Sequence, residues 1–242
     1  MHRFFVETAD FADGKILLVG ENAAHAHVLR PKMGEEIVCA ISGENVDYFC
    51  EVFAISKGEV SAKIIKTAPN SAETPIKITL FQALPKGNKM GDIIESATEL
   101  GIAQIVPILT SRCIGKGEKI GRWRKIAESA AKVAHRGQVP QIGETLGFSD
   151  ALDAAIAYDV VFACYEEEQE ETLHGFLKTA NVQNAKSVAF FIGAEGGFSP
   201  CEAALFAEHK IPTVSLGKRI LRAQSAAGVV LAQLNFYLEQ KL

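Results

Sequence analysis

The first part of the chain consists of short apolar runs separated by polar turns. Five runs have the length and the β-branched or aromatic content of strands, and they span residues 3–6, 16–19, 37–41, 46–53 and 60–65. The turn SGEN at 42–45 joins two of them as a hairpin, and a short helix is expected near 21–30. This pattern predicts a small antiparallel β-barrel.

Residues 67–75, TAPNSAETP, contain two prolines and otherwise small or polar residues. Such a composition is typical of a linker between compact units. We therefore place a first domain at 1–70 and a second at 75–242.

Beyond residue 75, apolar runs alternate with amphipathic helical patterns. Strands are predicted at 76–83, 103–110, 158–164, 187–193 and 213–217, and helices at about 88–100, 118–136, 168–179, from 200 and from 222. This alternation predicts an α/β domain in which helices cover both faces of a parallel sheet.

The composition indicates a folded protein without membrane helices, disulfides or a metal site. The chain has 242 residues, 48% of them hydrophobic, which suffices for a folded core. No apolar run approaches the roughly 18 residues of a membrane helix. The five cysteines are scattered without a CxxC pair, so we expect a reducing cytoplasm, no disulfides and no zinc. His25 and His27 fall on different faces of their helix, which disfavours a metal site.

Charge is unevenly distributed around a net charge of −4. Residues 86–136 carry ten basic and five acidic side chains, whereas residues 144–184 carry nine acidic ones and Lys178. In the helix at 118–136 the basic residues, Arg136 included, fall mostly outside the apolar stripe. This basic face suits a phosphate backbone, with a merely solvated helix face as the alternative. The acidic run at 166–171 is interpreted as a solvated helix start.

The segment FFIGAEGGFSP at 190–200 leaves a buried strand and turns on glycines. It contains no basic residue and holds Glu195, which disfavours a phosphate ligand. A carboxylate beside open backbone suits a ligand with hydroxyls, an amine or a positive centre, and a strained turn is the alternative. Ser199 and Glu202 form a capping box, so Ser199 is interpreted as a helix cap and not as a nucleophile.

A second loop, LGKRILRAQSAAG at 216–228, places Arg222 at the start of the last helix. Its planar guanidinium can hold a phosphate or a developing anion, and a surface arginine is the alternative. The helix that follows is apolar around more than one stripe, which favours a partner surface.

Four segments, 86–113, 123–142, 191–202 and 216–227, resemble in order and spacing the ribosomal small-subunit methyltransferase E family, and RFFV and HVLRPKMGEEI near the N-terminus fit it too. The resemblance spans nearly the whole chain. It implies a homodimer that uses S-adenosylmethionine to methylate N3 of one uridine in the 16S rRNA of the 30S subunit. It also implies an N-terminal PUA-like β-barrel that binds RNA and a C-terminal SPOUT α/β domain with a deep trefoil knot.

The resemblance assigns roles to individual residues. The implied cofactor-binding residues are Gly193, Glu195, Gly196, Gly197, Leu216, Gly217, Ile220 and Leu221. Arg222 is the implied catalytic residue, between the methyl donor and the RNA. The implied RNA-binding residues are Arg3, Arg30, Lys86, Lys89, Arg112, Arg122 and Arg136.

Several positions depart from the family pattern. Ala194 stands where relatives usually have proline, and Gln224 stands where a carboxylate is usual. Val133 and Ala134 replace a glutamine and a small polar residue. These changes leave a second hypothesis, a catalytically weak RNA-binding or ribosome-assembly protein of the same fold.

Overall fold

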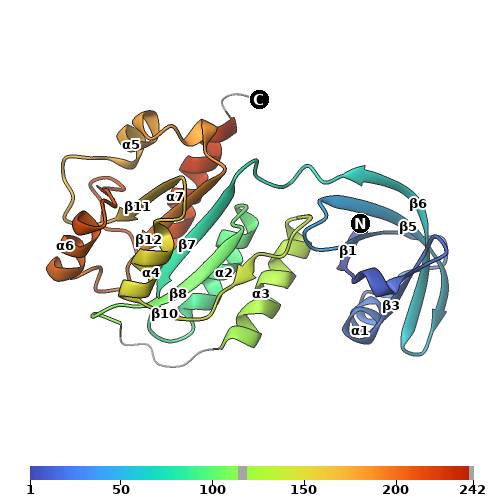
Figure 1. Ribbon diagram of the computed structural model, residues 1–242. Helices are drawn as coiled ribbons and strands as arrows, with labels where there is room; N and C mark the ends of the chain where they lie inside the picture. The colour runs from blue at the N-terminus through green and yellow to red at the C-terminus, as the bar shows by residue number, and fades with distance from the viewer. Residues whose placement is uncertain (114–118, 240–242) are drawn as a thin grey trace. The chain divides into compact units, whose positions relative to one another are not determined.

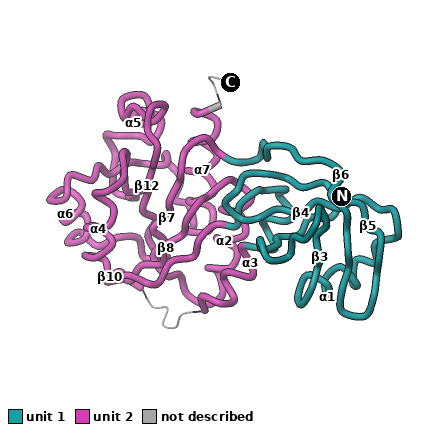
Figure 2. Tube along the Cα trace, turned by 45° about the vertical axis from the view of Figure 1, so that its right-hand side comes forward, with its two compact units in different colours: residues 1–73, 128–139 teal, residues 74–127, 140–242 magenta. Residues whose placement is uncertain are grey.

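The computed structural model describes residues 1–113 and 119–239 (Figure 1). The chain divides into two compact units, one of residues 1–73 and 128–139 and the other of residues 74–127 and 140–242 (Figure 2). The first unit therefore includes 128–139, a segment that the predicted limits of 1–70 and 75–242 place in the other domain.

The first unit is built on a sheet with the strand order β1-β4-β5-β6-β3-β2. Its strands are β1 His2–Phe5, β2 Phe11–Ala12, β3 Lys15–Val19, β4 Glu36–Ala40, β5 Val46–Ser56 and β6 Glu59–Pro69, with the helix α1 Gly20–Leu29 and a 3-10 turn at Thr8–Asp10. All five predicted strands, the hairpin partners and the helix are present. Phe4, Ile16, Leu18, Ile37 and Val52 are in the apolar core that the sheet encloses.

Two details of this unit differ from the sequence prediction. The sheet is not wholly antiparallel, because β1 pairs with β4 in parallel, and β3 and α1 lie between these two strands in the chain. The predicted linker does not begin at residue 67, because β6 continues to Pro69, which pairs with Val46 of β5. Backbone pairing here outweighs the loop-like composition.

The second unit contains a sheet in which every pairing is parallel, as predicted. The strands are β7 Lys77–Ala83, β8 Gln104–Leu109, β9 Gln141–Ile142, β10 Leu146–Gly147, β11 Val160–Cys164, β12 Ser187–Ile192 and β13 Thr213–Val214. The helices are α2 Lys89–Glu99, α3 Ile120–Val133, which continues into the first unit, α4 Phe148–Ala155, α5 Leu173–Thr179, α6 Pro200–Glu208 and α7 Ala223–Glu239, with a 3-10 turn at Val182–Asn184.

Helices cover both faces of this sheet (Figure 1). On one face, Leu152 of α4 and Phe206 of α6 pack against Phe81 and Phe191 of the central strands. On the other, α2 contacts α7, and α7 contacts β12. The parallel strands therefore deliver the loops after β7, β8, β11, β12 and β13 to one edge of the sheet.

Five elements of the second half differ from the prediction. The helix α4 and the short strands β9 and β10 were not predicted, because two-residue strands carry no period of their own. The acidic run at 166–171 precedes α5, since Thr172 caps this helix by accepting from the Gly175 amide at 3.1 Å. The helix α3 ends at Val133, where His135 adopts a left-handed conformation with φ of 55°.

Within residues 1–113 and 119–239, no helix is long and apolar enough to cross a membrane. The same part of the chain contains no cluster of three or more histidine, cysteine or acidic side chains arranged to hold a metal ion.

Candidate functional site

The loop after β12 is a tight turn that depends on two glycines. Gly197 has φ of 63°, and its amide donates to the Ala194 carbonyl at 3.0 Å. A Cβ on Gly193 would lie 2.9 Å from the Gly197 Cα and 3.0 Å from its carbonyl carbon. Since both contacts are with backbone, Gly193 cannot carry a side chain without moving the turn, and the left-handed backbone of Gly197 disfavours any residue with a Cβ.

The capping box predicted at the start of α6 is confirmed. The Ser199 side chain accepts from the Glu202 amide at 3.3 Å, and the Glu202 carboxylate accepts from the Ser199 amide at 2.8 Å. Glu202 is buried and also accepts from the Ser111 amide, in the loop after β8, at 2.7 Å. One carboxylate therefore ties two neighbouring loops together, and Ser199 serves as a cap.

The side chains of two basic residues predicted to contact RNA, Arg112 and Lys89, contact the glycine loop, and a third, Lys86, contacts it through its backbone amide while its side chain is exposed. The Arg112 guanidinium donates to the carbonyls of Gly196 at 2.6 Å and Phe198 at 3.1 Å. The Glu195 carboxylate forms an ion pair with Lys89 at 2.7 Å and accepts from the Lys86 amide at 3.2 Å. Burial alone would raise the pKa of Glu195, but the hydrogen bonds from Lys89 and from the backbone outweigh it and lower that pKa. Glu195 is therefore an anchored anion.

A cavity of about 330 Å³ lies at the edge of the sheet where the loops after β11, β12 and β13 meet the start of α7. All eight residues predicted to bind a cofactor line it: Gly193, Glu195, Gly196, Gly197, Leu216, Gly217, Ile220 and Leu221. Sequence reasoning missed a further group from the same loops: Cys164, Tyr165, Glu166, Lys218, Arg219, Ala223 and Ala226. The rule that ligands lie beyond the carboxyl ends of parallel strands points to the loop after β11, but it selects no residue in that loop.

The lining combines apolar, charged and backbone groups. Ile192, Leu216, Leu221 and Ala226 supply apolar surface. Glu166 and Glu195 supply carboxylates, and a Cβ on Gly197 would overlap the Glu166 carboxylate. This arrangement can hold a ligand that has an apolar planar part, hydroxyls and a cationic group.

Comparison with known proteins identifies the family. A family model described as an RNA methyltransferase domain matches residues 72–235, and a model described as an RNA methyltransferase PUA domain matches residues 18–65. The chain belongs to the RNA methyltransferase family.

Relatives with the predicted family name cover almost the whole of this RNA methyltransferase. The ribosomal RNA small subunit methyltransferase E of Bacillus subtilis is 29% identical over 251 residues, which cover 99% of this chain and 98% of the relative. The crystal structure of the enzyme of the same name from Neisseria gonorrhoeae, bound to S-adenosyl methionine, is 26% identical with a TM-score of 0.88, covering 98% of this chain and 97% of that one. A Legionella pneumophila protein in complex with the same cofactor is 28% identical with a TM-score of 0.86, covering 97% and 96%. The predicted family is confirmed, and so is the predicted combination of an N-terminal PUA-like domain with a C-terminal α/β domain.

Arg222 of this RNA methyltransferase is exposed immediately before α7. Its carbonyl accepts from the amides of Ser225 and Ala226, both at 2.9 Å, so its backbone begins the helix. Its chain neighbours Leu221 and Ala223 line the cavity, while Arg222 is not among the described lining residues.

The departure at Gln224 has a physical explanation. Its side-chain amide donates to the Asp92 carboxylate of α2 at 2.9 Å. A carboxylate at position 224 would repel Asp92 at this distance, whereas the amide links the starts of α2 and α7. The loss of a charge at this position therefore stabilises the contact between the two helices.

Two of the seven predicted RNA contacts are buried in the first unit. Arg3 is 6% exposed, and its guanidinium donates to both Asp47 oxygens, at 2.8 and 2.7 Å. Arg136 is 2% exposed, lies beyond the end of α3 and forms an ion pair with Glu73 at 2.6 Å. The prediction that Arg136 lies on an exposed basic face is wrong, because the chain turns inward after Val133. Arg30 and Arg122 are exposed as predicted.

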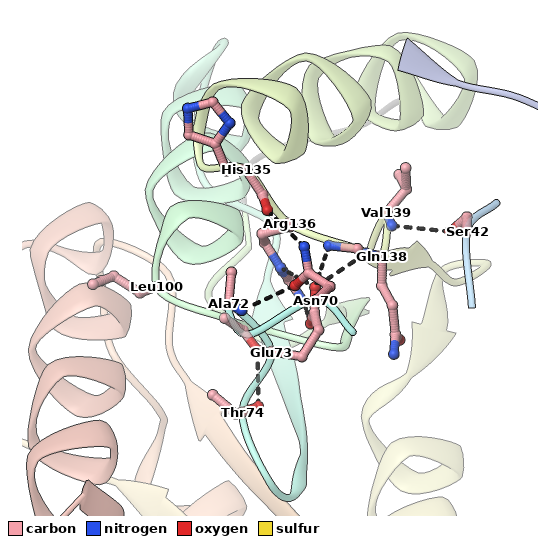
Figure 3. Close-up of polar contacts among 12 residues, drawn as sticks. Ser42, Asn70, Ala72, Glu73, Thr74, Leu100, His135, Arg136, Gln138 and Val139 are labelled. Carbon is pink, nitrogen blue, oxygen red and sulfur yellow. Dashed lines mark hydrogen bonds and ion pairs between the residues drawn. The ribbon is translucent and has the colours of Figure 1, made fainter. Parts of the chain in front are cut away.

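A polar network surrounds these two arginines. The Asn70 amide donates to Asp47 at 3.1 Å and to the His135 carbonyl at 3.0 Å, and Glu73 accepts from the amides of Gly137 at 2.9 Å and Gln138 at 3.0 Å. Figure 3 shows Asn70 and Glu73 beside the backbone of residues 135–138. These bonds attach the segment after α3 to the strand end at Pro69.

We expect Asp47 to contribute stability that is lost in acid. Burial raises the pKa of Asp47, but the bonds from Arg3 and Asn70 prevail and lower it below the ordinary value of 3.8. The folded state therefore binds this proton less readily than the unfolded chain, so the contribution is present above about pH 4 and falls as the pH drops toward the lowered pKa. The Asp47→Asn variant should show a shallower loss of unfolding free energy between about pH 4 and pH 2 in urea titrations. An unchanged slope would contradict this assignment.

Proposed function

We propose that the protein transfers a methyl group from S-adenosylmethionine to N3 of a uridine in the 16S rRNA of the small ribosomal subunit. One observation carries the proposal. The eight residues that the sequence resemblance assigns to cofactor binding, drawn from the separate loops after β12 and β13, line one cavity. The cofactor-bound structure of the Neisseria gonorrhoeae enzyme supports the choice of cofactor.

The cavity fits the chemistry of this cofactor. Its volume of about 330 Å³ lies within the range of about 300–1,000 Å³ found for small-molecule sites. Leu216, Leu221 and Ala226 offer apolar contacts to an adenine ring, and the glycine backbone offers hydrogen-bonding groups to hydroxyls. The Glu166 and Glu195 carboxylates favour a cationic ligand. When bound, S-adenosylmethionine supplies the methyl group on a sulfonium centre.

The protein's own residues then contribute placement and electrostatics. The glycine loop, held by Arg112 and by the pair of Lys89 with Glu195, fixes the backbone of the cofactor site before binding. Uridine N3 must lose its proton, which leaves negative charge on the uracil carbonyls. Arg222 stabilises that charge or holds the adjoining phosphate. The target base turns out of its stack to reach the cavity.

The proposal extends to assembly and place of action. We infer a homodimer whose contact includes the exposed side of α7, where Phe236 is 69% exposed and Val229 and Tyr237 are partly exposed. The first unit is proposed to act as the RNA-binding PUA-like domain and the second as a SPOUT domain with a trefoil knot. We place the reaction in the cytoplasm, where the small subunit is assembled.

The direct test uses purified protein, radiolabelled S-adenosylmethionine and 30S particles from cells that lack the gene. The expected product is N3-methyluridine in 16S rRNA, detected by mass spectrometry after nuclease digestion. RNA from the deletion strain should lack this nucleoside. Unchanged methyluridine content would overturn the assignment. Binding to 30S particles without methyl transfer would favour the second hypothesis, a ribosome-assembly protein.

We expect the Gly193→Ala variant to bind S-adenosylmethionine about 10-fold to 50-fold more weakly. The added Cβ would collide with the Gly197 backbone at 2.9 Å, and relieving such overlap costs roughly 1–3 kcal/mol. Calorimetric titration with the cofactor measures the effect.

The matched control is Gly121→Ala, at an exposed helical position with nothing within 4 Å of the new Cβ. This variant should bind the cofactor like the wild type and keep its thermal stability. Equal affinity of Gly193→Ala and the wild type would show that the loop does not form the cofactor site.

A further inference from the structure

The hairpin of β5 and β6 in the first unit contains two irregularities. Phe49 pairs with Lys66 but the next residue, Cys50, pairs with Ile64, so Ile65 has no partner. Similarly, Val52 pairs with Ala62 and Ala54 pairs with Ser61, so Phe53 has no partner. Ile65 and Phe53 are therefore the extra residues of two β-bulges.

Both bulges place an apolar side chain in solvent. Ile65 is 51% exposed and Phe53 is 39% exposed, whereas their chain neighbours Ile64 and Val52 pack in the core of the sheet. Bulges commonly redirect side chains toward a functional surface. Two bulges in one hairpin, each with an exposed apolar residue, indicate a contact surface.

Lysine side chains surround these apolar groups. The Lys15 Nζ lies 5.5 Å from the Phe53 ring centroid, and the Lys66 Nζ lies 4.5 Å from the Phe49 centroid. Lys63 lies directly opposite Lys15. We call the outer surface formed by Lys15, Phe49, Phe53, Lys63, Ile65 and Lys66 the hairpin surface.

Charge changes sign across the sheet at this surface. Direct pairing aligns Glu36 of β4, Glu51 of β5, Lys63 of β6 and Lys15 of β3 in one row. The β4 end of the row is acidic and the β3 end is basic. An anionic polymer would therefore follow β6 and β3, with Phe53 and Ile65 beside it.

We propose that the hairpin surface binds a single-stranded segment of the RNA substrate. Bases of single-stranded RNA stack on exposed aromatic side chains while lysines neutralise the phosphates. A duplex hides its base faces, so it would gain nothing from Phe53 and Ile65. The inference rests on the proposed function, since it takes RNA as the substrate. It assigns RNA binding to residues that are not among the seven basic residues predicted from the sequence.

Substitution of Phe53 tests the stacking contact. The Phe53→Ala and Phe53→Leu variants should each bind single-stranded oligouridine about 10-fold more weakly or worse, while Phe53→Tyr should stay within about two-fold of the wild type. Leucine preserves apolar area without a ring, so it separates stacking from simple burial. The control is Val28→Ala, at a side chain of α1 that is 78% exposed. Thermal unfolding and cofactor affinity should be unchanged in all four variants.

Salt dependence tests the lysines. Replacing Lys15, Lys63 and Lys66 together by glutamine should reduce the slope of log K against log salt by about 2, since each phosphate contact to a single strand contributes about 0.7. The control variant replaces Lys178, Lys186 and Lys210, three exposed lysines of the second unit, by glutamine. Its slope should match that of the wild type.

The outcomes separate this inference from the proposed function. Suppose that the wild type methylates 30S particles and that the Phe53→Ala variant binds oligouridine as tightly as the wild type. The assignment of RNA binding to the hairpin surface is then wrong, and the proposed function is retained. If the wild type transfers no methyl group but Phe53→Ala loses its RNA binding, the RNA-binding role of the hairpin surface is supported and the proposed function is wrong. Equal binding of a duplex of the same length would overturn the inference. A shift from dimer to monomer in sedimentation of Phe53→Ala would also overturn it, because the surface would then join two copies of the chain.

Discussion

The Arg136→Ala variant should lose about 3–5 kcal/mol of unfolding free energy. The Arg136 side chain is 2% exposed, and its guanidinium donates to Glu73 through Nη2 at 2.6 Å and through Nε at 3.3 Å. The Glu73 side chain is 10% exposed, so alanine at position 136 would leave a buried carboxylate without its cation. The amides of Gly137 and Gln138 still donate to it, but they carry no net charge.

Urea unfolding followed by circular dichroism measures this loss. The control is Arg122→Ala on the exposed side of α3, which should change stability by no more than about 0.5 kcal/mol. The double variant Arg136→Met with Glu73→Gln should recover part of the stability, because it removes both charges while the glutamine oxygen still accepts from the amides of Gly137 and Gln138. A loss below about 1 kcal/mol in Arg136→Ala would contradict the buried ion pair and would reopen a role for Arg136 at the surface.

The Arg222→Ala variant should slow methyl transfer on the order of 10²-fold, as the loss of one well-placed charge stabiliser does in other enzymes. Its affinity for S-adenosylmethionine should stay within about two-fold of the wild type, because the cavity is lined by Leu221 and Ala223 on either side of it and not by Arg222 itself. The exposed guanidinium is available to the RNA. Single-turnover transfer to 30S particles measures the rate, and calorimetry measures cofactor binding.

Two further variants refine the role of Arg222. Arg222→Lys should retain part of the rate, since it keeps the charge but loses the planar fork of donors. Arg124→Ala removes another exposed arginine, whose partner Glu144 is 3.5 Å away, and should leave the rate unchanged. A parallel loss of rate and cofactor affinity in Arg222→Ala would show that Arg222 is needed to shape the start of α7.

The alternation of apolar runs and amphipathic helices was enough to predict the parallel sheet, because strand and helix periods are properties of neighbouring residues. The capping box of Ser199 and Glu202 was predictable for the same reason, since its partners are three residues apart. Glycine spacing and the order of four motifs pointed to the cavity-lining residues after β12 and β13.

Other features could not be read from local patterns. Phe53 and Ile65 sit in runs that fit regular strands, and only the pairing of β5 with β6 makes them extra residues that face solvent. The short strands β9 and β10 exist because β8 offers them an edge.

Local patterns in the chain suffice to predict which elements form, where the loops at the sheet edge begin and which glycines permit the turn after β12. The contacts of each basic residue depend instead on the folded arrangement of the chain. Arg136 meets Glu73 across 63 positions, and Arg112 meets Gly196 across 84, so the partner that buries or anchors a cation is absent from its own neighbourhood in the chain. A charged side chain looks the same in sequence whether it faces water or an opposite charge, and the fold alone brings that opposite charge within reach.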